Sequence, residues 1–113
     1  MVRDPMGLLF WKNDRKIDAF ANALANDLFS FVRPELAREH FEGRLRDSKK
    51  KQHKVEQRLS GMIYEMKKFI DANSLGIYGK ARLQKKFSDR LTELGYDASV
   101  TRQLVETLLL RNL

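Results

Sequence analysis

The stretch that decides the fold is residues 41–69, which read FEGRLRDSKKKQHKVEQRLSGMIYEMKKF. Within it, one set of residues recurs at alternating steps of four and three: Phe41, Leu45, Ser48, Gln52, Val55, Leu59, Met62, Met66 and Phe69. This heptad spacing places the set on a single stripe of an α-helix, and a stripe of this kind is buried against a neighbouring helix. The sequence therefore predicts an all-α fold with a long central helix.

The helical span around this stripe is unusually long. Between Pro34 and the turn signal Asn73-Ser74-Leu75-Gly76, no strong helix stop is present. A single helix over residues 35–73 would be about 58 Å long, about twice the width of a small domain. We therefore expect one of two arrangements. Either the span breaks near Gly43 or Asp47-Ser48, or its middle projects and pairs with another chain.

A first amphipathic helix is predicted before this span. Asn13 or Asp14 can cap its start, and Pro34 marks its end because the residue before a proline is disfavoured in the α region. Its expected buried face recurs at three and four: Ile17, Phe20, Ala21, Leu24, Leu28 and Phe31.

A C-terminal helical hairpin is predicted after the turn. Its first helix runs from Gly79 to Leu94, and its second begins at a cap on Asp97 or Ser99. In the turn, we expect Gly76 as a left-handed C-cap and Gly79 as an N-cap, with Ile77 and Tyr78 packed in the corner. The expected fold is thus a small bundle of about four helices.

Length and composition indicate one folded domain over residues 1–113, with residues 1–12 as a flexible or peripheral segment. The chain has no cysteine, which excludes disulfides, thiolate metal sites and a cysteine nucleophile. The apolar run Met6–Trp11 is far shorter than the roughly 20 residues of a membrane-spanning helix, and it lacks the features of a secretory signal. A cytoplasmic location is therefore expected.

The chain is basic, with 22 Lys and Arg against 15 Asp and Glu, and much of its net charge of +7 lies in one segment. The cations of that segment are Arg44, Arg46, Lys49, Lys50, Lys51, Lys54 and Arg58, against Asp47 and Glu56, a balance of 7 − 2 = +5. Such a segment is typical of a phosphate-backbone binder. However, the cations spread over roughly 220° of a helix, and no aromatic residue interleaves with them. These two features favour a solvated helix over a nucleic-acid surface.

The stretch from Gly76 to Arg82 is a second candidate for anion binding. Glycines at a helix N-terminus followed by Lys80 and Arg82 can hold an anion through free N–H groups and the positive end of the helix dipole. The structural interpretation, in which both glycines serve only as helix caps, is favoured because such glycines are common at helix ends.

Metal and catalytic constellations are not evident in the sequence. His40 and His53 are separated by thirteen positions and have no flanking carboxylates at ligand spacing. The chain also lacks a G-x-S-x-G motif. We therefore expect no enzyme activity, no metal, no cofactor and no small-molecule substrate.

Apolar residues are in surplus at both ends of the chain, and this surplus needs a cover. The leading hypothesis is a non-enzymatic interaction or regulatory module that self-associates, with a homodimer favoured, or binds a partner protein. A membrane surface is the least favoured cover. The expected interface comprises Phe41, Leu45, Val55, Leu59, Met62, Met66, Phe69, Leu109 and Leu110. The alternative is a nucleic-acid-binding protein that uses residues 44–58, with Lys80 and Arg82 assisting.

Overall fold

The computed structural model describes residues 5–112 of the chain, and the side chains of residues 13–45 and 47–111. Its α-helices are α1 (Pro5–Phe31), α2 (Pro34–Phe41), α3 (Lys49–Ala72), α4 (Ile77–Glu93) and α5 (Ala98–Leu108). The described range also contains two short 3₁₀ turns, η1 (Arg44–Asp47) and η2 (Leu110–Asn112), and no strand. The all-α prediction is confirmed. The expected number of about four helices is wrong, because residues 5–112 form five.

The first helix, α1, begins at Pro5, upstream of the expected cap at Asn13 or Asp14. Proline is tolerated in the first turn of a helix because its missing N–H would have no intrahelical partner there. No other proline occurs before Pro34, and α1 ends close to it, as expected. Residues 5–12 of the predicted N-terminal segment therefore have helical backbone, while their side chains and residues 1–4 lie outside the described part of the chain.

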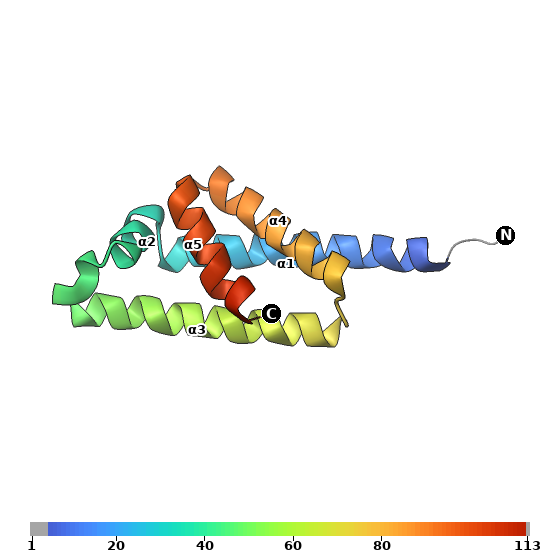
Figure 1. The fold of residues 1–113 in the computed structure, drawn as a ribbon, viewed down its shortest axis with the longest axis horizontal. Helices are drawn as coiled ribbons and strands as arrows, with labels where there is room; N and C mark the ends of the chain where they lie inside the picture. The colour runs from blue at the N-terminus through green and yellow to red at the C-terminus, as the bar shows by residue number, and fades with distance from the viewer. Residues whose placement is uncertain (1–4, 113) are drawn as a thin grey trace.

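The long span after Pro34 is divided at both of the places that the sequence indicates. After α2, Gly43 has φ 76°, a left-handed conformation that glycine adopts at low cost. The turn η1 follows, and Ser48, with φ −124° and ψ 80°, separates it from α3. The chain reverses direction through this corner, so α3 runs back alongside α1 (Figure 1).

The two long helices form the length of the molecule, and α4 and α5 pack across them (Figure 1). α1 makes its most extensive contact with α4, while α3 contacts α1, α2 and α5. The N-terminal end of α1 extends past the other helices (Figure 1). The basic start of α3 and the projecting end of α1 are consequently at opposite ends of the molecule.

The apolar stripe of α3 lies in the core of its own chain. Val55, Leu59, Met62 and Met66 are buried, and Ile70 continues the stripe by one more turn. The core residues supplied by other helices include Ile17, Ala21, Leu24 and Leu28 from α1, Leu83, Phe87 and Leu91 from α4, and Leu104 and Leu108 from α5. The cover of the stripe is therefore intramolecular, and its burial does not require a second chain.

The turn between α3 and α4 differs from the expected arrangement of its glycines. Ser74 takes the left-handed conformation, with φ 49°, whereas Gly76 is extended and forms the N-cap of α4. Gly79 lies inside α4, where an added Cβ would be 3.1 Å from Cδ2 of Leu75. The glycine at 79 thus permits close packing and is not a cap. Ile77 is 90% exposed and does not pack in the corner.

The C-terminal part of the chain forms two helices, α4 and α5, and the first begins at Ile77, two residues before the predicted start at Gly79. The carboxylate of Asp97 accepts a hydrogen bond from the backbone N–H of Val100 at 2.8 Å, which makes Asp97 the N-cap of α5. The hydroxyl of Tyr96 donates to the backbone carbonyl of Val32 and ties the hairpin to the end of α1. At the end of the chain, Leu109 is buried and Leu110 is half exposed.

Candidate functional site

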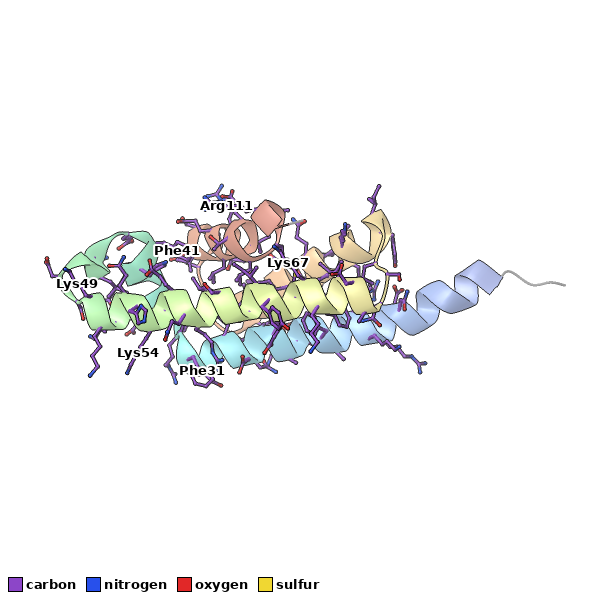
Figure 2. All side chains as sticks on the ribbon, turned by 90° about the horizontal axis from the view of Figure 1, so that it is seen from below. Phe31, Phe41, Lys49, Lys54, Lys67 and Arg111 are labelled. Atoms are coloured by element: carbon purple, nitrogen blue, oxygen red, sulfur yellow. The ribbon has the colours of Figure 1, made fainter. Side chains whose placement is uncertain are left out.

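A groove of about 490 Å³ lies where the end of α1, the start of α2 and the first half of α3 meet. Its lining combines three apolar side chains, Phe31, Leu36 and Val55, with four polar ones, Lys51, Lys54, Gln57 and Arg58. Figure 2 shows Phe31 and Lys54 at the same end of the molecule. The groove is therefore an apolar depression with cations along one side.

Helical spacing explains how α3 supplies those cations. Lys51, Lys54 and Arg58 are separated by steps of three and four, so they lie on adjacent turns of one face. Val55 lies beside this face and is buried, which anchors the face against the core. Three of the seven cations predicted for this segment are thus gathered on one groove, within a much narrower arc than the whole set.

An aromatic ring from another helix lies among these cations. The Cζ atom of Arg58 is 3.4 Å from the centroid of the Phe31 ring, and an Nη of Arg58 is 3.4 Å from a carboxylate oxygen of Asp27. Phe31 nevertheless remains 59% exposed. Because Arg58 covers one face of the ring, the accessible area belongs to the opposite face and the edge. The Nε of Arg58 is buried and has no hydrogen-bond partner.

The role of Phe31 corrects the sequence interpretation twice. We expected Phe31 on the buried face of the first helix, but the buried residue at this point is the next one, Val32. We also expected no aromatic residue among the cations, and Phe31 supplies one from outside the segment. The only signal in the sequence is the pair of phenylalanines at 29 and 31, which cannot both lie on one helix face.

A second hollow of about 560 Å³ continues from the groove around the corner between α1 and α2. The two share Phe31 and Leu36, and the second also contains Arg33, Glu35 and Glu39. Charges of both signs line this hollow, so the excess of positive charge is confined to the side formed by α3.

The other cations of the basic segment have different surroundings. Lys49 and Lys50 are exposed and line a separate shallow hollow with His53. Arg44 is paired with Glu42 through its guanidinium. The side chain of Arg46 lies outside the described part of the chain. The structure therefore brings together Lys51, Lys54 and Arg58, and places the remaining cations around them.

Arg82 is engaged within the molecule. Its Nε and one Nη each donate to a carboxylate oxygen of Asp18 at 2.9 Å, and Asp14 lies 3.6 Å away. The hydrogen bond to Asp18 is the main cause that raises the pKa of Arg82 above its ordinary value. Lys80 is partly buried in the first turn of α4. This turn lies near the C-terminal end of α3, whereas the groove lies beside the N-terminal half of α3. These two residues are not part of the groove.

The residues expected to form an interface between chains lie mostly in the core. The buried ones are Leu45, Val55, Leu59, Met62, Met66 and Leu109. Phe41 and Phe69 are partly buried against that core, and the ring of Phe69 stacks on that of Phe20 with 4.1 Å between centroids. Leu110 is 50% exposed. Of the expected set, Leu110 presents the largest free apolar surface.

The described residues offer neither a metal cluster nor a membrane-spanning helix. Among the side chains that the structure describes, no three His, Asp or Glu residues gather closely enough to hold a metal ion. Within residues 5–112, no helix is long and apolar enough to cross a membrane.

Comparison of the chain with protein-family models, with curated proteins and with solved structures finds no match in any of the three.

Proposed function

We propose that this protein is a non-enzymatic binding module for single-stranded nucleic acid, and that the groove beside α3 is its binding surface. The observation that carries the proposal is the position of Phe31, which is largely exposed, lies against Arg58 and lines the same groove as Lys51 and Lys54. An aromatic ring bordered by cations is the combination by which proteins hold an unpaired base and its phosphates.

The electrostatics at the start of α3 support phosphate binding. Lys49, Lys50 and Lys51 occupy the first turn of α3, which contains no acidic residue. The N-terminal end of a helix already carries partial positive charge, and the three lysines increase it. No acidic side chain in the first turn offsets this positive potential. A phosphate backbone would supply the missing negative charge and would release counterions on binding.

The groove favours an unpaired strand over a duplex. Phe31 can stack on a base only if the face of that base is free, and bases in a duplex are already stacked on their neighbours. The groove is also compact, with a cavity volume of about 490 Å³. We therefore assign the aromatic contact to one or two unpaired bases and the lysine contacts to the flanking phosphates.

The leading expectation from the sequence, self-association, receives less support. Its main motive was an apolar stripe in need of a partner, and the stripe is covered by α1 and α5 of the same chain. An acidic protein segment is the other occupant that the groove chemistry allows, because lysines bind carboxylates and the floor accepts apolar side chains. Direct binding of a single strand, of a duplex and of an acidic peptide separates these occupants.

The test is fluorescence anisotropy of a labelled single strand of about 15 nucleotides, titrated with the full-length protein at salt from about 50 to 200 mM. We expect affinity to fall with salt, with a slope near −2 if about three phosphates are neutralised. The variant K51E/K54E should lose affinity at least about tenfold and show a smaller slope. The matched control is K67E/K68E, which changes two exposed lysines of the same helix outside the groove; Figure 2 shows Lys67 well away from Lys54.

A second pair of variants tests the aromatic contact. Phe31→Ala should weaken single-strand binding by about tenfold, the effect of losing one stacked base. Tyr64→Ala removes an aromatic of similar exposure, 67%, that is not in the groove, and should leave binding unchanged. Equal losses in the two lysine variants, tighter binding of a duplex, or binding of an acidic peptide without nucleic acid would each overturn the proposal.

A further inference from the structure

The end of the molecule opposite the groove carries an exposed apolar tip. Ile77 is 90% exposed at the start of α4, and the neighbouring Tyr78 is 49% exposed. Both line a hollow of about 230 Å³ whose other contributors are Asn13 and Ile17 from α1, residues 74–76 of the turn, and Gly79. An isoleucine held in this position at a helix start contributes nothing to the core, so its exposure needs another explanation.

The projecting part of α1 extends from the same tip. The helix continues from Asn13 back to Pro5 and passes beyond the other helices (Figure 1). The sequence of this arm includes Met6-Gly7-Leu8-Leu9-Phe10-Trp11, which has no charged residue. The backbone of this arm therefore leaves the fold beside Ile77, at an end of the molecule built from two elements that are far apart in the sequence.

The charged residues near this extremity are predominantly positive. Lys12 ends the apolar run, Arg15 and Lys16 are exposed on the next turn of α1, and Lys80 follows on α4. The two carboxylates of this part of α1, Asp14 and Asp18, both pair with Arg82, which offsets one of their two negative charges. The excess charge around the apolar tip is consequently positive.

This charge decides which occupant suits the tip. Two copies of the chain meeting at this surface would bring their basic residues together, and like charges juxtaposed in this way disfavour association. An anionic lipid surface is complementary, because lysines and arginines approach its headgroups while apolar and aromatic side chains enter the interface. A tryptophan in the arm fits the same environment.

We propose that the tip formed by Ile77, Tyr78 and the projecting end of α1 docks the protein peripherally on an anionic membrane surface. In this arrangement, the helix lies at the interface and does not cross the bilayer. The basic groove at the other end of the molecule stays free, so the two binding surfaces can act independently.

The sequence provides an internal probe for this proposal, because Trp11 is the only tryptophan. The full-length protein is titrated with vesicles of phosphatidylcholine containing about one third phosphatidylglycerol, and with vesicles of phosphatidylcholine alone. We expect the tryptophan emission to shift to shorter wavelength with the anionic vesicles only, and the shift to weaken as salt rises. Brominated lipids should quench this emission.

Variants at the two ends of the molecule separate the two proposals. Ile77→Glu should reduce partitioning into anionic vesicles by at least about tenfold, and Lys16→Glu should reduce it by several-fold. Tyr64→Glu, which changes an exposed aromatic outside the tip, is the control. K51E/K54E should retain vesicle binding, whereas Ile77→Glu should retain nucleic-acid binding.

Three outcomes would overturn the membrane proposal. The first is an emission that does not change with anionic vesicles. The second is equal partitioning of Ile77→Glu and the unmodified protein. The third is a tryptophan emission that shifts with protein concentration in the absence of vesicles. This result would show that the tip binds a second copy of the chain.

Discussion

The guanidinium of Arg58 lies over the ring of Phe31, with its Cζ atom 3.4 Å from the ring centroid, although the two residues belong to different helices. Asp27, one turn before Phe31 on α1, pairs with the same guanidinium. This contact joins the end of α1 to the first half of α3 and forms one wall of the groove. Arg58 therefore has two roles: it stabilises the packing of α1 on α3, and it positions Phe31 in the proposed binding surface.

Replacing this arginine should have a modest cost. We expect Arg58→Ala to lower the free energy of unfolding by about 1 kcal/mol, because it removes a partly exposed cation–π contact and an ion pair. Lys54→Ala, on the same face without these contacts, should change it by less than about 0.5 kcal/mol. Chemical denaturation measures both values, and equal effects of the two variants would contradict the structural role of Arg58.

Truncation of the buried stripe tests whether its cover is intramolecular. Met66 is fully buried, so Met66→Ala should lower the free energy of unfolding by about 2–5 kcal/mol. Because the surrounding residues come from the same chain, the midpoint of unfolding should not change over about a hundredfold range of protein concentration. A midpoint that rises with concentration would show that a second chain contributes to the cover.

Two glycines in helices should respond differently to alanine. A Cβ at Gly61, in the middle of α3, meets no atom within 4 Å, so Gly61→Ala should stabilise the protein by about 0.5–1 kcal/mol through helix propensity. A Cβ at Gly79 would be 3.1 and 3.2 Å from two atoms of Leu75, and this crowding should cancel or outweigh the same gain. Thermal unfolding of both variants checks the prediction, which fails if Gly79→Ala is the more stable.

Tyr96 should make stability sensitive to alkaline pH. Burial raises the pKa of its phenol above the ordinary value of 10.0, an effect that Arg33 partly opposes. The folded state therefore holds the phenolic proton at pH values where the unfolded state has released it. By linkage, this contribution to stability is fully present below pH 10 and decreases as the pH rises above it.

The variant Tyr96→Phe isolates that contribution. It should cost about 1 kcal/mol at neutral pH, because the carbonyl of Val32 loses its hydrogen bond. Its free energy of unfolding should then fall less steeply above pH 10 than that of the unmodified protein. Parallel pH profiles for the two proteins would contradict the assignment of this alkaline sensitivity to Tyr96.

The groove shows what periodicity could not predict. The spacing of Phe31 after Leu28 fits a buried helix face, but the chain turns toward Pro34 at this point and Val32 occupies the core instead. Which aromatic residue reaches the basic segment depends on how the end of α1, beside the corner between α1 and α2, packs on α3. Arg82 gives the opposite case, because a cation that the sequence offers to an external anion is bound by Asp14 and Asp18.

Local chemistry, by contrast, was readable from the residues alone. Proline at 34 and a cap at Asp97 or Ser99 act on their own stretches of backbone, so the sequence determined the helical class and the approximate ends of these helices. It left open whether residues 35–73 form one helix or two, and the corner at Gly43 and Ser48 decides this. Only the tertiary structure decided which neighbour covers the stripe of α3, because an apolar helix face has the same spacing whether its partner belongs to the same chain or to another. The meeting of Phe31 with Arg58 was decided in the same way, by packing between helices that no local pattern encodes.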